Sequence, residues 1–186
     1  MSTLIVENLK GPTTGSNANK VIVPSGQDLH AVGHIIQMVE QQGNGSSSQG
    51  FGTSTAYSSN SYTNIDHGSI TITPKFATSK ILILMSTHVY VLGYSVNTWR
   101  GANIRIQRGS TDISTDGGGY GTAAFFENDT DRYMTHQARF VIDAPNTTSA
   151  VTYQAQVASK VSGLTVHLNR SDYGSGGFLS ALEIAQ

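Results

Sequence analysis

Histidines are the residues of this chain best suited to binding a metal ion. His30 and His34 stand four positions apart, and on a helix this spacing places two imidazoles on one face, as in a zinc site. The glutamate of the HExxH metalloprotease motif is absent, and Gly33 lies between the two histidines. We therefore favour a structural or solvent-exposed pair over a metal site.

The remaining histidines are His67, His88, His136 and His167. They fall at or near expected strands and have no regular ligand spacing, although two of them could meet in space. Side chains on the face of a strand are the favoured interpretation.

Carboxylates gather loosely in the middle of the chain, at Asp112, Asp116, Glu127, Asp129 and Asp131. Two carboxylates separated by about 5–9.5 Å could serve as the acid and base of a glycosidase. Solvation of loops, or a calcium ion, explains such a group better than catalysis does.

Motifs for nucleophilic or phosphate chemistry are missing. The chain has no GxSxG elbow and no cysteine, and the run GGGYG at 117–121 lacks the lysine of a phosphate-binding loop. We expect a protein that is not an enzyme, with no catalytic residue, no bound cofactor and no metal.

Large aromatic side chains occur in expected loops, at Tyr94, Trp99, Tyr120 and Tyr173. Exposed aromatics among glycine and serine often contact sugars or proteins, so these four are candidate receptor or glycan contacts. The favoured alternative is that the rings cap the ends of the domain or pack between subunits.

Composition restricts the class of protein that must position these residues. Only 12% of the 186 residues are charged, against roughly 25% in an average soluble domain, and the net charge is -1. Such a surface of hydroxyls, amides and glycine favours assembly or adhesion, because little charge has to be desolvated. No basic stripe exists for nucleic-acid binding.

Export and membrane signals are also missing from the sequence. The opening residues lack the basic and apolar regions of a signal peptide, and the apolar stretch around Ile81 to Met85 is far shorter than the roughly 20 residues of a membrane helix. We expect no membrane insertion.

The first 26 residues are interpreted as a docking arm. Residues 3–9 and 20–23 are short β-prone runs, and an isolated pair of strands is at best marginally stable in water. Their apolar side chains are therefore expected to pack on a partner chain or on the main domain. These candidate assembly residues are Leu4, Ile5, Val6, Leu9, Val21, Ile22 and Val23.

Residues 27–61 are expected to form a linker with a short helix. Leu29, Val32, Ile36 and Val39 lie near helical spacing in 28–42, with Asp28 as N-cap, although Gly33 weakens a helix and an extended segment stays open. The glycine and serine content of 43–61 is typical of a flexible loop. The compact body is expected to begin after it.

Residues 62–186 show the alternation of a β domain. Expected strands begin at Ile70 and Ile72 and continue through 80–92, 103–108, 122–126, 139–143, 151–158, 164–168 and 178–185, about eight in all. Turn signals separate them, for example Arg108-Gly109-Ser110 and Ser162-Gly163. The predicted fold is all-β, an antiparallel β-sandwich resembling a jelly roll, behind an extended N-terminal arm.

Two parts of the sequence resemble a known class of proteins. TLIVENLKGPTTGSNANKVIVPSG is similar to the leader of virion structural proteins and fibres of marine tailed phages, especially those of cyanobacteria. The blocks YSSNSYTNIDHGSITITPKFATSKILI, IQRGSTDI, FVIDAPNTTSAVTYQAQVAS and FLSALEIAQ look like the ordered blocks of a tail-fibre-like domain. The resemblance implies a leader that docks on the particle and a β-sandwich head that is usually trimeric, and it supplies no catalytic residue.

The sequence therefore predicts a virion protein, a tail-fibre or tail-associated subunit that forms a homotrimer and contacts other proteins of the tail, baseplate or capsid. Two alternatives stay open: a capsid decoration protein, and a carbohydrate-binding module that recognises a host surface glycan. Oligomers are expected because a sandwich with few charges has edge strands to protect.

Overall fold

The computed structural model describes residues 13–15, 31–42, 51–52, 56–92, 100–114, 123–125, 132–160, 162–169 and 176–186. Within these residues the regular structure is entirely β, which confirms the predicted fold class. The strands are β1 Ile35–Gln42, β2 Ala56–Tyr57, β3 Thr63–Ile72, β4 Lys80–Leu92, β5 Arg100–Arg108, β6 Thr111–Asp112, β7 Ala123–Phe125, β8 Arg132–Asp143, β9 Val151–Ser159, β10 Thr165–Leu168 and β11 Phe178–Ile184. The described residues contain no helix able to cross a membrane.

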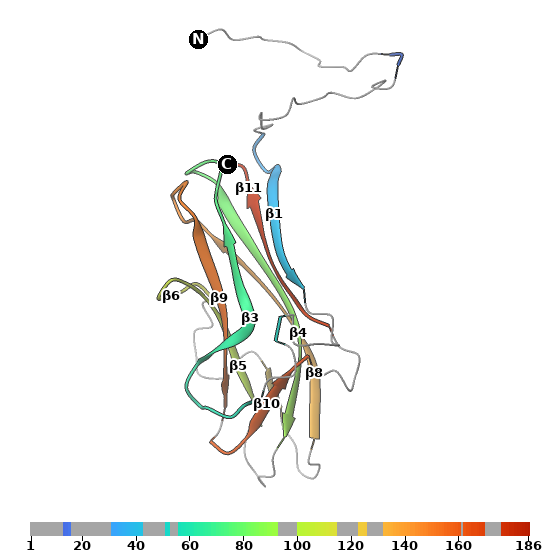
Figure 1. Cartoon of the computed structure of the whole chain (residues 1–186), viewed down its shortest axis with the longest axis vertical. Coiled ribbons are helices and arrows are strands. Elements are labelled where there is room, and N and C mark those ends of the chain that lie inside the picture. The colour runs from blue at the N-terminus through green and yellow to red at the C-terminus, as the bar shows by residue number, and fades with distance from the viewer. Residues whose placement is uncertain are drawn as a thin grey trace.

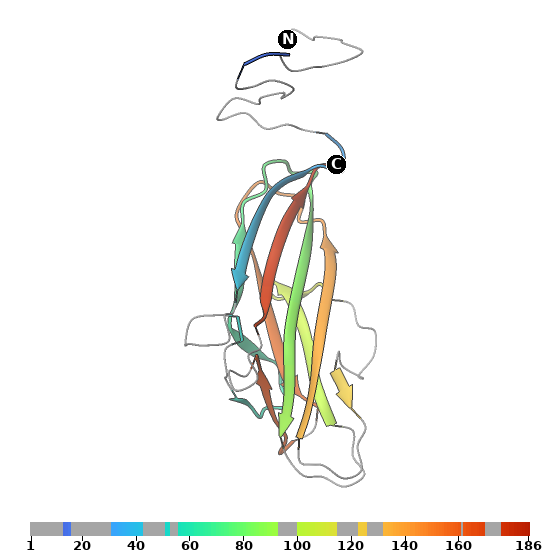
Figure 2. The same ribbon diagram turned by 90° about the vertical axis from the view of Figure 1, so that its right-hand side faces the viewer.

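Two antiparallel sheets face each other as a β-sandwich (Figure 1). Sheet A has the order β1-β11-β4-β10-β2, with β8 on the other side of β4, and sheet B has the order β3-β9-β5-β6, with β7 also paired to β5. Figure 2 shows β1, β11, β4 and β8 of sheet A side by side. The long strand β4 is the centre of sheet A because it pairs with β8, β10 and β11.

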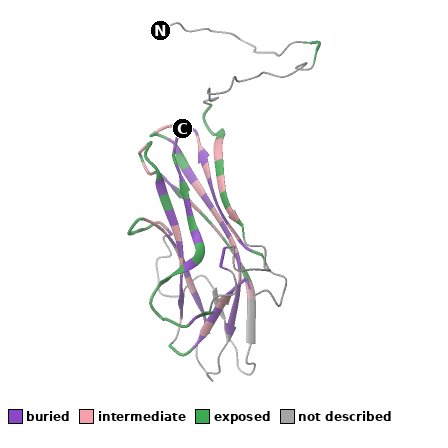
Figure 3. Cartoon of the chain, in the orientation of Figure 1, coloured by how far each residue is buried: buried purple, intermediate pink, exposed green. Residues whose placement is uncertain are grey.

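The core lies between the sheets and follows from the period of two in the sequence. On β9, Val151, Tyr153, Ala155 and Val157 are buried, as the alternation predicts. On β5, Ile104 and Ile106 lie beside Val157 and Ala155 in the same sheet. From sheet A, β4 contributes the buried residues Ile81, Ile83, Met85, Val89 and Val91. Figure 3 shows buried residues alternating with less buried ones along strands of both sheets.

Within the segment 28–42, residues 35–42 form a strand where the spacing favoured a helix, so the predicted helix is wrong for the described residues of this segment. Residues 35–42 form β1, which pairs antiparallel with β11, and Gly33 has a left-handed backbone with φ 82°. The hydrogen-bond partners of β1 lie in a strand about 140 residues away in sequence. The local spacing of apolar residues therefore does not reveal this pairing. The extended alternative for this segment is the correct one.

The sandwich also begins earlier than the predicted boundary at residue 62. Besides β1, the strand β2 at Ala56–Tyr57 pairs with β10, and Phe51 is fully buried in the core. The described part of segment 27–61 is therefore integral to the fold and is not a linker.

A polar bridge joins the two sheets inside the sandwich. The phenol of Tyr153 on β9 donates a 2.7 Å hydrogen bond to Oδ2 of Asp143 at the end of β8, and Arg108 of β5 contacts the same oxygen at 3.1 Å. Burial, together with the hydrogen bond to Asp143, raises the pKa of Tyr153 far above its ordinary value. The phenol thus stays a donor, and the carboxylate is compensated from both sides.

A second buried polar side chain, Asn169, connects three segments. Its Oδ1 accepts a 2.9 Å hydrogen bond from the backbone amide of His88, and its Nδ2 donates one of 2.8 Å to the backbone oxygen of Phe51. The backbone amide of Asn169 also donates to the oxygen of His88 at 2.9 Å. This network holds the buried Phe51 against β4 and the end of β10.

Candidate functional site

The outer face of sheet A is apolar over four adjacent strands. The register places Met38 of β1, Leu182 of β11, Leu82 of β4 and Ile142 of β8 in one row, because each pairs with the next across the sheet. Neighbouring rows add Leu84 and Phe140, then Phe178, and at the other end Ile184. We call these eight residues the apolar face: Met38, Leu82, Leu84, Phe140, Ile142, Phe178, Leu182 and Ile184.

Much of the apolar face is open to solvent. Phe140 is 78% exposed, Ile142 62% and Met38 55%, although all three are large hydrophobic side chains. The leucines of β4 and β11 are half-buried, since their neighbours in the sheet shield them. None of the eight belongs to the buried core cluster, which uses the alternate residues of β4 and β11, with Val39 of β1 and Val141 of β8 packed against it.

The apolar face gives way to polar and aromatic side chains farther along β4. Ser86 Oγ lies 2.7 Å from Nε2 of His136, and the rings of His136 and His88 meet edge to face with centroids 4.8 Å apart. Tyr90 and His167 continue the same face on β4 and β10. Burial, and next the nearby His136, lower the pKa of His88 and favour its neutral form.

Two of the predicted strand histidines, His88 and His136, therefore do come together in space. Within the described residues, no three His, Cys, Asp or Glu side chains are grouped so that they could hold a metal ion. Of the predicted helix-spaced pair, His34 is exposed before β1, whereas His30 lies outside the described residues.

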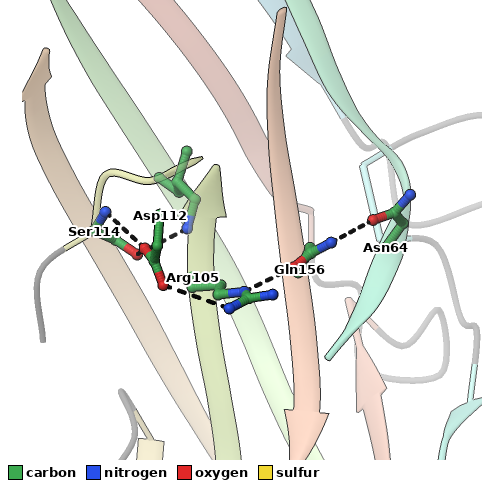
Figure 4. Close-up of polar contacts among 6 residues, drawn as sticks. Asn64, Arg105, Asp112, Ser114 and Gln156 are labelled. Carbon is green, nitrogen blue, oxygen red and sulfur yellow. Dashed lines mark hydrogen bonds and ion pairs between the residues drawn. The ribbon is translucent and has the colours of Figure 1, made fainter. Parts of the chain in front are cut away.

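The outer face of sheet B is polar and bonded within itself. Arg105 of β5 donates from Nε to Oε1 of Gln156 on β9 at 2.7 Å, and Gln156 donates from Nε2 to Oδ1 of Asn64 on β3 at 2.8 Å (Figure 4). The same guanidinium reaches Asp112 of β6 at 3.6 Å and stacks over the ring of Tyr62 at 3.9 Å. This chain of contacts runs across all four strands β3, β9, β5 and β6.

Asp112 is held in the β5–β6 turn region and has structural partners. Its Oδ1 accepts hydrogen bonds from the backbone amide of Ser114 at 3.0 Å and from the Ser114 hydroxyl at 2.9 Å, and Ser114 Oγ in turn accepts the amide of Ile106 (Figure 4). The other carboxylates of the predicted acidic group, at 116, 127, 129 and 131, lie outside the described residues.

The residues predicted to dock or to bind a receptor also lie outside the described residues. This applies to the arm side chains Leu4, Ile5, Val6, Leu9, Val21, Ile22 and Val23 and to the loop aromatics Tyr94, Trp99, Tyr120 and Tyr173. Their roles stay predictions.

The apolar face was not identified as a site from the sequence, yet signals for it were present. Residues 80–92 are apolar on both faces at first, and Phe178, Leu182 and Ile184 share one face of their strand. The structure places that face of β11 on the outside, with Leu179 and Ala181 buried on the inside.

Comparison with known proteins adds no relative to this description. No protein-family model matches the chain, and no curated protein is significantly similar to it.

Proposed function

We propose that this chain is a structural subunit of a tailed-phage virion, a tail-fibre or tail-associated protein. Residues 1–26 dock on the particle, and the β-sandwich forms a homotrimeric head. The observation that carries the proposal is the apolar face, because a sandwich that exposes such a surface across four strands is suited to a permanent assembly. The leader and the ordered blocks resemble phage fibre proteins, and this resemblance suggests that the assembly is the tail or a fibre of a virion.

The polar network on sheet B supports the same proposal. Its side chains satisfy one another across four strands, so that this face is suited to remain in water while the opposite face is covered. A subunit with one covered and one solvated face fits the wall of an oligomeric head.

Mass spectrometry of purified particles, followed by labelling with antibodies to the sandwich and electron microscopy, tests the proposal. We expect the protein in the particle and the label on the tail or its fibres. Label spread over the shell would instead support the capsid decoration alternative. Absence from particles that contain their other structural proteins would contradict a virion role of either kind.

Glycan recognition by the loop aromatics is the alternative from a different class. It predicts binding to a glycan array that is lost in Trp99→Ala and retained in the matched control Tyr62→Ala, whose ring is occupied by Arg105 on sheet B. An array without signal for the intact chain would remove this alternative.

A further inference from the structure

We propose that the apolar face is a homotypic interface, through which the copies of the homotrimeric head bury their A sheets against one another around a common axis. The inference deepens the proposed function, because it names both the surface and the partner. It rests on the part of the proposed function in which the chain assembles with copies of itself. The occupant is a second copy of this chain.

The need for a covering partner comes from the contrast between the two outer faces. On sheet B, the row Ser69, Gln154, Gln107 and Asp112 is polar from one edge to the other. On sheet A, the corresponding row Met38, Leu182, Leu82 and Ile142 is apolar from one edge to the other. Burial of the apolar row on sheet A is favourable by about 25 cal/mol for each Å² of its surface that is removed from water.

The charge pattern supports a copy of the same chain as the partner. The central row carries no charge, and the next row continues from Phe140 and Leu84 through Ser180 to Glu40 on the edge strand β1, so charge is confined to the margin of the face. The charged side chains that border the central row have opposite signs, Lys80 before Leu82 on β4 and Glu40 after Met38 on β1. Copies can therefore be arranged with unlike charges facing each other at the margin.

The edge of sheet A strengthens the inference. Among the described residues β8 has one bonded neighbour, β4, so this 12-residue strand lies at the edge of sheet A in the described part of the chain. The exposed side chains Phe140 and Ile142 lie on this strand. An edge strand with exposed apolar side chains is a surface that natural proteins bury, and a copy packed on the apolar face covers those side chains.

Sedimentation equilibrium of the full chain tests the interface. We expect the intact protein to form oligomers above the 19.8 kDa monomer mass, and Phe140→Glu and Ile142→Glu each to weaken association by about tenfold or more. The matched control is Thr152→Glu, at an exposed position on the outer face of sheet B, which should associate like the intact chain. Circular dichroism shows whether each variant stays folded.

Thiol protection provides a measurement that does not depend on disruptive charges. Because the chain has no cysteine, Ile142→Cys and Thr152→Cys each introduce a single reactive thiol. Raising the protein concentration should slow thiol labelling at position 142 by about tenfold and leave position 152 unchanged.

A monomeric intact chain would overturn the inference, as would oligomers that persist in both glutamate variants or a thiol at 142 that stays reactive in the oligomer. None of these results bears on whether the protein is found in purified particles, which is the test of the virion role. The interface and the virion role can therefore fail separately, whereas a monomeric chain would also contradict the homotrimeric head.

Discussion

Glu183 is a charged side chain in the interior, and its surroundings keep it ionised. The residue is 0% exposed on β11, and its carboxylate accepts hydrogen bonds from Gln37 Nε2 at 2.6 Å and from the backbone amides of Lys75 at 2.8 Å and Phe76 at 3.2 Å. Burial acts to raise the pKa of Glu183, but these hydrogen bonds outweigh it and the pKa is lowered. The carboxylate thereby fastens the β3–β4 connection to β11 and β1.

We predict that Glu183→Gln lowers the free energy of unfolding by about 2 kcal/mol, because the amide offers one acceptor where the carboxylate offers two. The folded-state pKa is depressed, so this stabilisation is present above the ordinary pKa of 4.5 and is lost as the pH falls through the folded-state value. Urea unfolding at pH 7 and at about pH 3 measures both effects. The difference between variant and intact chain should shrink in acid.

The matched control is Glu40→Gln on β1, where the carboxylate is exposed. This change should stay within about 0.5 kcal/mol of the intact protein at both pH values. Equal losses in the two variants would show that Glu183 has no special role as a buried anchor.

Gly177 is required by a close approach of three segments. A Cβ at this position would lie 2.7 Å from the backbone oxygen of Ser86 and would also collide with the side-chain amide of Asn169. We predict that Gly177→Ala destabilises the fold by about 2–3 kcal/mol, since backbone and a hydrogen-bonded side chain must both move. Thermal unfolding of Gly177→Ala measures the loss.

Gly163→Ala is the control for a glycine whose requirement is conformational alone. Its φ is 88°, and a Cβ added there would meet no atom within 4 Å, so the cost should be only about 1 kcal/mol. A loss at Gly177 no larger than that at Gly163 would contradict the steric explanation.

At the scale of elements, the fold depends on a pairing between the first and the last described strands. β11 lies between β1 and β4, and the backbone amide of Gly33 donates to the oxygen of Ala185 at 2.8 Å. We predict that deleting residues 178–186 abolishes cooperative unfolding, because β1 loses its only bonded neighbour among the described strands and the core loses Leu179 and Ala181.

Circular dichroism and a thermal melt check this deletion. Removal of Gln186 alone, which is exposed after β11, is the control and should leave the transition in place. A sharp transition in the longer deletion would mean that sheet A is stable without its inner strand.

The sequence predicts elements well where one face is apolar and the other polar. Alternation at 70–72, 104–106 and 151–157 identified strands and their buried faces correctly, since a half-buried strand has an apolar residue at every second position. It failed at 35–42, where Ile36 and Val39 fit helical spacing as well as they fit a strand. Glu183 is a charged residue buried within an apolar strand. Its hydrogen-bond partners come from distant segments, so a local sequence pattern does not predict its burial.

The apolar face shows a second limit of local patterns. On β4 both faces are apolar at first, and on β11 the face that enters the core is the one that carries the charge of Glu183, so the sequence pattern does not identify the buried face. The decision is made by sheet B, which covers Ile81, Ile83, Leu179 and Ala181 and leaves the other face outside. An exposed apolar sheet face can be recognised only once the structure shows which face of each strand the other sheet covers.

At the scale of the whole molecule, the proposals assign different tasks to two parts of the chain. Residues 1–26 are proposed to attach the protein to the particle, and the apolar face is proposed to join the copies to one another. Every strand of the described sandwich begins after residue 34, so the sheets and the apolar face are complete without the arm.

We therefore predict that deletion of residues 1–26 leaves a folded sandwich that still associates but no longer binds to particles. Incorporation is measured by adding the purified variant to particles that lack the protein, and association by sedimentation equilibrium. A second variant replaces Val21, Ile22 and Val23 by serine in the full-length chain. It should also reduce binding to particles, because apolar contacts are expected to dominate docking. Deleted chains that bind particles would contradict the docking role, whereas deleted chains that become monomeric would show that the arm, and not the apolar face, joins the copies.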